Sequence, residues 1–258
     1  MICIGLDCGA KTVKAVVLKD GNLVGKGIEL ARLDTNQAAR KACKTALAMA
    51  QLSDEVASKA FATGVGKSEP DFVDDVLTEV TADARGVHSR DAEIKTIIDI
   101  GAEEARVIKV DANGKVVDFA VNERCAAGTG AFADAMARIL EVTPEELGTL
   151  SLSSTEDIAI GAQCVVFAES EIVSLLHRQV SKPNLARAVL NAIAERVGPL
   201  GRRVGITEDV TVIGGVSRSA GFIQCLQNRL KQQIRLLPDA EYLGAVGAAV
   251  TACRKHGV

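Results

Sequence analysis

The sequence predicts an α/β protein built from two lobes of like topology. Hydrophobic residues make up 48% of the 258 residues, but aromatic residues make up only 3% and Trp is absent, so the core must consist of Ala, Val, Ile and Leu. The chain opens with short strands and then becomes Ala-rich and helical. This pattern restarts further along, where Asp99-Ile100-Gly101 matches Asp7-Cys8-Gly9. A repeat of this kind predicts two lobes, each opening with an antiparallel β-meander followed by helices.

The first lobe begins with three predicted strands. Residues 2–7 and 13–19 have strand patterns, and a third strand follows at about 23–30. Asp20-Gly21 between the second and third strands is typical of a tight hairpin turn.

Helical elements follow this meander. The pattern is helical from Thr35 to about residue 51, and the Thr35 hydroxyl is suited to capping the helix. Residues 59–65 predict another strand. Pro70 predicts the first turn of a helix over 70–81.

The second lobe begins at about residue 95. Residues 95–121 predict three strands, with a turn at Asn113-Gly114 between the last two. We therefore divide the chain into an N-terminal lobe, 1–94, and a C-terminal lobe, 95–258, each resembling ribonuclease H in topology.

The rest of the second lobe is mostly helical. Thr143-Pro144-Glu145-Glu146 is a capping box with proline at the first helical position, and Asn184 is a predicted helix cap. The other elements predicted here are helices at 129–141, 168–180, 184–197, 217–231 and 244–254, and strands at 211–215 and 233–237.

Composition excludes several classes of protein. The net charge of −3 gives no reason to expect nucleic acid or an anionic membrane surface as a partner. The apolar N-terminus is too short for a signal peptide, and no stretch approaches the roughly 18 apolar residues that span a bilayer. A cytoplasmic protein is expected.

The chain has an odd number of cysteines, and no two of them are separated by the short spacing of a paired motif. They stand at positions 3, 8, 43, 125, 164, 225 and 253. This argues against a disulfide framework and against a self-contained zinc knuckle. Most of them, including Cys3 and Cys8, are expected to be small core residues.

Three strand-to-glycine turns indicate phosphate binding. In the first, Asp7 ends a strand and Gly9, Lys11 and Thr12 follow, which places backbone N–H groups and a cation where a phosphate can sit. Asp7 is also suited to holding Mg²⁺ through water. The nearby Lys14 is included in this predicted site.

The other two turns lie in the second lobe. Asp99 and Gly101 repeat the first turn, and Gly214-Gly215 ends a strand just before Ser217 opens a helix. Three such turns in this order are far more specific than any one. Neither G-x-x-x-x-G-K-[ST] nor G-x-G-x-x-G occurs, which disfavours P-loop and Rossmann sites.

These segments resemble those of the actin, sugar-kinase and heat-shock-70 superfamily of ATPases. DCGAKTVK, DIGAEE and IGGVSRSAGF are similar to its first phosphate, second phosphate and adenosine segments. The resemblance implies that ATP binds in a cleft between the lobes and that hydrolysis changes their relative angle.

Two short segments, each containing one cysteine, restrict the resemblance to one family of these ATPases. NERCAAGTG, around Cys125, and AQCVVFAESE, around Cys164, resemble the cysteine segments of the BadF/BadG/BcrA/BcrD ATPase family. This family contains ATP-dependent activators of 2-hydroxyacyl-CoA dehydratases and ATPase subunits of benzoyl-CoA reductase. The resemblance implies that Cys125 and Cys164 bind half of one 4Fe–4S cluster at a dimer axis.

The number and the settings of the cysteines are compatible with a cluster shared between two protomers. A cluster of this kind usually takes four thiolates, and only two of the cysteines lie in distinctive settings. A second protomer around a two-fold axis would supply the other two. Each of these cysteines precedes a predicted helix, and helix N-termini stabilise negative charge.

The chain departs from the family pattern in both lobes. Ala10-Lys11 stands where Ser-Thr is frequent, and the second loop has Gly101-Ala102-Glu103-Glu104 where Gly-Gly-Gln-Asp is usual. Glu103 or Glu104 is the candidate catalytic residue that positions the attacking water. The extra charge at 103 faces phosphate and suits a subunit paired with a more competent partner.

We therefore expect an oxygen-sensitive, dimeric ATPase of anaerobic metabolism that donates single electrons at low potential. Its predicted cofactors are ATP, Mg²⁺ and one 4Fe–4S cluster per dimer, and ferredoxin or flavodoxin is the expected electron donor. The acceptor is a 2-hydroxyacyl-CoA dehydratase if the chain is a homodimeric activator. It is the reductase component if the chain is a subunit of a benzoyl-CoA reductase, in a heterodimer with a related chain. A small-molecule kinase of the same fold is a further alternative.

Overall fold

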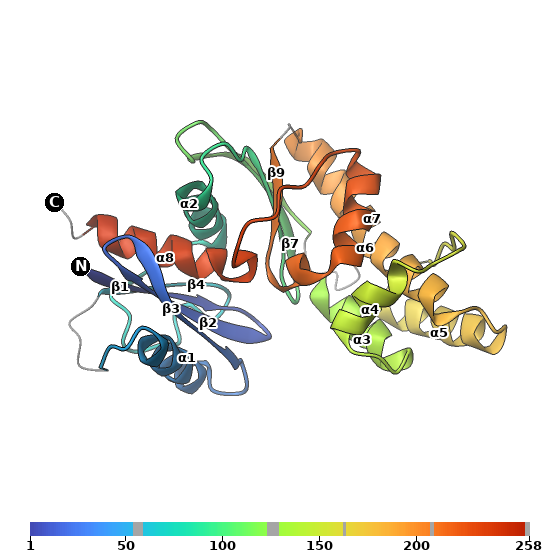
Figure 1. Ribbon diagram of the computed structural model, residues 1–258, viewed down its shortest axis with the longest axis horizontal. Coiled ribbons are helices and arrows are strands. Elements are labelled where there is room, and N and C mark those ends of the chain that lie inside the picture. Colours follow the sequence, from blue (N-terminus) through green and yellow to red (C-terminus); the bar gives the residue numbers. More distant parts are fainter. Residues whose placement is uncertain (54–58, 123–128, 162–163, 207–208, 256–258) are drawn as a thin grey trace. The chain divides into compact units, whose positions relative to one another are not determined.

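The computed structural model describes residues 1–53, 59–122, 129–161, 164–206 and 209–255. Contacts group the chain into two units (Figure 1). One comprises Met1–Ile97, Val110–Val117 and Leu237–Val258, and the other Ile98–Lys109 and Asp118–Leu236. This grouping places residues 237–258 with the first unit, whereas the predicted division at 94/95 assigns them to the second lobe. That division stays a prediction.

The first unit is built on a sheet whose strands, among the described residues, run in the order β3-β2-β1-β4-β5. The predicted meander is confirmed as β1 (Ile2–Cys8), β2 (Thr12–Lys19) and β3 (Asn22–Leu30), paired antiparallel. β4 (Lys59–Thr63) pairs with β1 in parallel, and β5 (Asp75–Val76) pairs with β4.

The described residues of this unit include three helices. α1 (Thr35–Met49) packs on β3, and α8 (Leu243–Lys255) packs on β1 and on α2 (Glu79–Arg90). Glycines allow α8 to approach closely, since a Cβ atom at Gly5 of β1 would lie 2.0 Å from the carbonyl oxygen of Ala245. Thr35 does not cap α1. The Asp34 side chain does so, accepting a hydrogen bond from the amide of Gln37 at 2.8 Å.

The predicted helix over 70–81 is wrong. Residues 71–74 instead lead into edge strand β5, and the Asp74 carboxylate accepts a hydrogen bond from the amide of Ala60 at 2.9 Å. Pairing with β4 therefore overrides the local signal of Pro70. The helix begins later, at Glu79, where the Thr78 hydroxyl accepts a bond from the Thr81 amide.

The second repeat of the meander is confirmed as β6 (Thr96–Ile100), β7 (Ala105–Val110) and β8 (Val116–Val121). With β9 (Val210–Ile213) these form a sheet in the order β8-β7-β6-β9 among the described residues. The predicted strand at 233–237 is reduced to one isolated parallel bridge, between Val210 and Ile234.

The helices of the second unit enclose a continuous apolar core. They are α3 (Gly130–Ile139), α4 (Pro144–Ser151), α5 (Val165–His177), α6 (Lys182–Val204) and α7 (Ala220–Leu230). The capping box before α4 is confirmed. A 3₁₀ turn over Gly215–Arg218 precedes α7, and Ser219 caps it, so the predicted helix 217–231 is divided.

Asn184 is not the helix N-cap that the sequence predicted. Ser181 caps α6, whereas Asn184 lies in its first turn and is 4% exposed. Its side-chain oxygen accepts bonds from the Ser154 hydroxyl and from the amides of Thr155 and Glu156, at 3.0–3.4 Å. The buried amide therefore fixes the segment that precedes α5.

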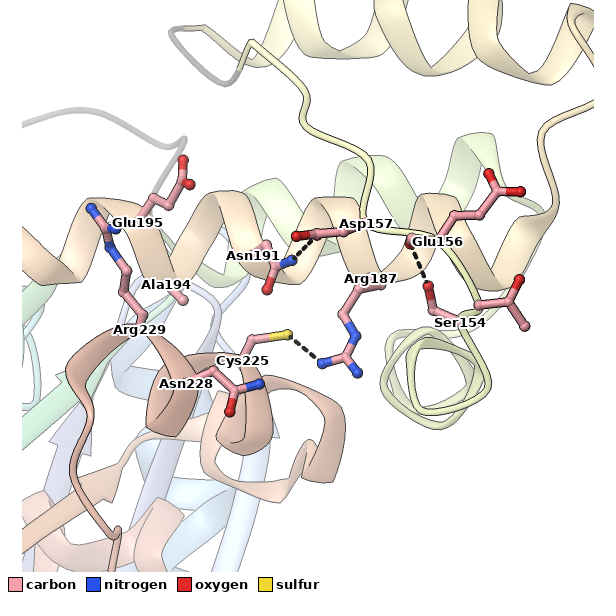
Figure 2. Close-up of a pocket in the computed structure, with 11 residues that line it drawn as sticks. Ser154, Glu156, Asp157, Arg187, Asn191, Ala194, Glu195, Cys225, Asn228 and Arg229 are labelled. Atoms are coloured by element: carbon pink, nitrogen blue, oxygen red, sulfur yellow. Dashed lines mark hydrogen bonds between the residues drawn. The ribbon is translucent and has the colours of Figure 1, made fainter.

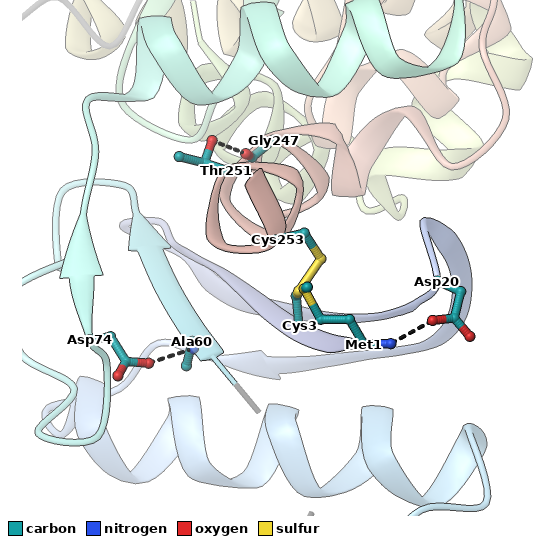
Figure 3. The surroundings of a disulfide bond; sticks show 8 residues. All are labelled: Met1, Cys3, Asp20, Ala60, Asp74, Gly247, Thr251 and Cys253. Atoms are coloured by element: carbon teal, nitrogen blue, oxygen red, sulfur yellow. Dashed lines mark hydrogen bonds and ion pairs between the residues drawn. A yellow bond between two sulfur atoms is a disulfide. The ribbon is translucent and has the colours of Figure 1, made fainter. Parts of the chain in front are cut away.

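One disulfide bond, Cys3–Cys253, is present among the described residues (Figure 3). It joins β1 to the end of α8, whereas the cysteine spacing had argued against a disulfide framework. Cys8, Cys43 and Cys225 are buried free thiols, as expected of core cysteines. Burial raises the pKa of the Cys8 thiol to about 12.

In the described part of the chain, none of the helices is long and apolar enough to cross a membrane.

Candidate functional site

The first predicted phosphate loop is the turn between β1 and β2. The Gly9 amide donates to the carbonyl oxygen of Thr12 at 3.1 Å, which closes the turn around Lys11. Asp7 stands at the end of β1, and its carboxylate is 3.3 Å from Nζ of Lys14, which is 8% exposed. The five residues predicted here therefore lie in one hairpin of the first unit.

The second predicted loop joins β6 to β7 and contains an ion-pair network. Asp99 is 8% exposed, and its carboxylate lies 2.7 Å from the guanidinium of Arg106. The same guanidinium is 2.8 Å from the carboxylate of Glu104. Glu103, in contrast, is exposed and has no side-chain partner in the described structure.

The glycine turn after β9 lies against this loop. Gly214 has φ of +85°, and a Cβ atom there would lie 2.4 Å from the carbonyl oxygen of Ile100 and 2.7 Å from Oδ1 of Asp99. The Ser217 hydroxyl donates to the Gly214 carbonyl at 2.7 Å. Only glycine fits at 214, because both the backbone angle and the contact exclude a side chain.

The second loop is also bonded to the start of α3. The amides of Gly130 and Ala131 each donate at 2.9 Å, to the carbonyl oxygens of Gly101 and Ala102 respectively. α3 in turn packs on α5. A displacement of the loop must therefore move the first turn of α3, because two backbone bonds join them.

Cys164 is the residue that immediately precedes α5. It is an exposed free cysteine at the N-cap position, and its side chain makes no capping hydrogen bond. The apolar side chains of Val166, Phe167 and Val173 are 64%, 71% and 42% exposed. Cys125 lies within 123–128, outside the described residues. Among those described, no three His, Cys, Asp or Glu side chains gather to hold a metal ion.

The structure thus places the predicted residues in two groups, one in each unit. Asp7, Gly9, Lys11, Thr12 and Lys14 form the first. Asp99, Gly101, Glu103, Glu104, Gly214, Gly215 and Ser217 form the second. The sequence analysis did not single out Arg106, the second residue of β7, whose guanidinium pairs with both Asp99 and Glu104.

The fold is that of the actin- and sugar-kinase-like ATPases. A ROK family glucokinase from Streptomyces griseus, solved with glucose and AMPPNP, has this fold: its TM-score is 0.60 at 17% identity, over 98% of this chain and 100% of that one. The model of the BadF/BadG/BcrA/BcrD ATPase family matches residues 4–252, and the chain belongs to that family.

Three relatives with names of known function show which members of the family the chain is similar to. The (R)-2-hydroxyglutaryl-CoA dehydratase activating ATPase of Acidaminococcus fermentans is 37% identical, over 98% of this chain and 97% of its own. The 2-hydroxyisocaproyl-CoA dehydratase activator of Clostridioides difficile is 34% identical, over 98% and 95%. A benzoyl-CoA reductase subunit of Thauera aromatica is 28% identical, over 99% and 94%.

A solved structure supports the similarity. The activator of the 2-hydroxyisocaproyl-CoA dehydratase from Clostridium difficile, with bound ADPNP, has a TM-score of 0.94 and 33% identity. The match covers 99% of this chain and 95% of that one. The predicted family and fold class are therefore confirmed.

Replacing Arg106 by methionine is expected to destabilise the second unit by about 3 kcal/mol, because the buried Asp99 would lose its ion pair with the guanidinium. Urea denaturation of the two proteins measures the difference. Arg40→Met is the control: it breaks the exposed pair with Asp71 and should cost less than about 1 kcal/mol. Equal losses in both variants would contradict the expectation.

Proposed function

We propose that the protein is an ATP-dependent electron donor that activates a 2-hydroxyacyl-CoA dehydratase. The observation that carries the proposal is the pair of backbone bonds from the second phosphate loop to the start of α3. Cys125 precedes α3 in the sequence, and Cys164 precedes α5, on which α3 packs. The loop that would contact the terminal phosphate is therefore bonded to the helix that follows Cys125 in the sequence, and that helix packs on the one that follows Cys164.

The predicted nucleotide site assigns distinct tasks to these residues. Asp7 and Asp99 would hold Mg²⁺, and Lys11 and Lys14 would face the phosphates together with the glycine amides of the three turns. Gly215 and Ser217 would contact the nucleoside. Nucleotide turnover changes the position of α3 only if the loop binds ATP and ADP with different geometry.

Of the two candidate catalytic residues, Glu103 is favoured. Glu104 is paired with Arg106, whereas the exposed Glu103 carboxylate has no partner among the described residues and is available to orient a water. We assign this positioning role to Glu103.

Cys164 suits a cluster shared between two copies of the chain. Its thiol is exposed, its side chain is not used as a helix cap, and the start of α5 offers backbone N–H groups that favour negative charge. The exposed Val166, Phe167 and Val173 provide apolar surface next to it that a second copy would cover. A 4Fe–4S cluster held by Cys125 and Cys164 of both copies would supply one-electron chemistry at low potential.

The proposed donor to this cluster is a ferredoxin or flavodoxin, in the cytoplasm. The alternative acceptor, the reductase component of a benzoyl-CoA reductase, is favoured by the relative from Thauera aromatica. That relative is 28% identical, against 37% and 34% for the two dehydratase activators, so we prefer the dehydratase.

The test is activation of a dehydratase. The chain, purified without oxygen and reduced by a one-electron donor, is mixed with a 2-hydroxyacyl-CoA dehydratase and its substrate. We expect dehydration with Mg-ATP and none with Mg-ADPNP, because hydrolysis drives the transfer. Native mass measured in parallel distinguishes a homodimer from a chain that needs a related partner. Equal dehydration with and without ATP would refute the proposal.

A further inference from the structure

A pocket of about 450 Å³ lies wholly within the second unit (Figure 2). Arg187 and Asn191 line it from α6, Cys225 and Arg229 line it from α7, and residues 154–157 form its third wall. None of its lining residues belongs to the predicted nucleotide or cluster site. Its volume is within the range of sites for small metabolites.

The walls of this pocket are fixed before any ligand arrives. Arg187, Asn191 and Glu195 are spaced four residues apart and so lie on one face of α6. The third wall is bonded to the buried side chain of Asn184. Asp157 is further fixed by a bond from the side-chain amide of Asn191, at 3.3 Å. A preformed site loses little ordering entropy on binding.

Arg187 has unused hydrogen-bonding capacity inside the pocket. Its side chain is half-buried and points toward Cys225, to whose sulfur it donates at 3.6 Å (Figure 2). Burial raises the pKa of the Cys225 thiol although Arg187 opposes the shift, so this partner is a neutral, weak acceptor. The other guanidinium N–H groups are donors for which the described structure provides no carboxylate.

Arg229 also lines the pocket, but its side chain is exposed and extends away from Arg187 (Figure 2). Its Nε atom would lie 3.1 Å from a Cβ atom at Gly198, about three turns of α6 beyond Arg187. Neither Arg187 nor Arg229 forms an ion pair with a carboxylate of the described residues, since none lies within 4.0 Å of its guanidinium. The three acidic lining residues, Glu156, Asp157 and Glu195, are exposed, so solvent screens them more than it screens Arg187. They nevertheless give the rim negative charge, which disfavours a polyanion such as a nucleotide.

We propose that this pocket binds a small mono- or dianion, with its oxyanion group on Arg187. Guanidinium groups bind carboxylate and phosphate oxygens with paired hydrogen bonds, and the side-chain amides of Asn191 and Asn228 complete a polar lining. The two sources of such a group are a carboxylic acid and a phosphate ester.

Thermal unfolding of the whole chain tests the proposal. Inorganic phosphate and malonate are the probes, sodium chloride at equal ionic strength is the reference, and saturating Mg-ADP keeps the nucleotide site filled. A ligand of the folded state raises the unfolding midpoint in a concentration-dependent way. We expect one probe to do so, which identifies the source, and Arg187→Gln to weaken its apparent affinity at least about tenfold.

Arg203→Gln is the matched control, because Arg203 is an exposed arginine of the same helix outside the pocket. It should respond to the probe as the wild type does. A response by Arg187→Gln equal to that of the wild type, or no difference between both probes and chloride, would overturn the proposal. If Arg187→Gln fails to fold, the rate of Cys225 alkylation in the wild type decides: the bound probe should slow it, and an unchanged rate counts against the site.

Discussion

Replacing Cys164 by alanine is expected to remove iron from the anaerobically purified protein. If two chains share one cluster, the substitution removes two of its four thiolates, since each copy loses one. Loss of half of the ligands should leave no stable cluster. One 4Fe–4S cluster per pair of chains corresponds to two iron and two sulfide atoms per chain. In the variant, both values should fall to near zero. Cys125→Ala should have the same effect.

Cys43→Ala is the matched control for both variants. Cys43 is a free cysteine of α1 that is 7% exposed and belongs to the core of the first unit. Its replacement should cost some stability but leave iron and visible absorption unchanged. Wild-type iron content in both Cys125→Ala and Cys164→Ala would show that these residues do not bind a cluster.

Gly247→Ala is expected to destabilise the protein by about 3 kcal/mol, the upper part of the usual range for overpacking. A Cβ atom at Gly247 of α8 would lie 1.7 Å from the carbonyl oxygen of Ala82 in α2. The contact is reciprocal, since a Cβ at Gly86 would lie 1.9 Å from the carbonyl oxygen of Leu243. Because the obstacles are backbone atoms, the helices must separate. The gain in helix propensity, about 1 kcal/mol, does not offset this.

Gly198→Ala in α6 separates the packing effect from the propensity effect. Its nearest neighbour would be Nε of Arg229, at 3.1 Å, which belongs to a flexible side chain that can move. We expect this variant to be as stable as the wild type or slightly more stable. Chemical denaturation of the three proteins measures both differences. Wild-type stability of Gly247→Ala would show that α2 and α8 tolerate a wider separation.

The parts of the fold that were predicted correctly carry their information locally. The turn at Asp20-Gly21 and the alternating patterns around it define the first meander without help from distant residues. The capping box before α4 is likewise complete within four residues. The assignment of Cys164 to the start of a helix was confirmed for the same reason, although α5 begins three residues earlier than predicted.

The failures at Pro70 and Asn184 involve contacts between residues distant from one another in the sequence. Pro70 is a sound helix-start signal, but the bond from Ala60 to Asp74 commits the following segment to an edge strand. Asn184 is a good capping residue whose side chain is instead bonded to the segment before α5. The close approach of α2 to α8 depends on Gly86 and Gly247, which no local pattern connects.

The candidate site was predictable to a similar degree. The glycine turns and their acidic residues could be named from the sequence, since each is a short motif. Arg106 could not be assigned its role, because pairing with both Asp99 and Glu104 depends on the register of β6 and β7. The distinction between Glu103 and Glu104 also required the structure.

The Cys3–Cys253 bond makes the protein a covalent ring closed over a sequence separation of 250 residues. A single proteolytic cut anywhere between these residues would therefore release no fragment. The nicked molecule would differ from the intact one only by the mass of one water, and its two pieces would part only after a thiol reductant opened the ring.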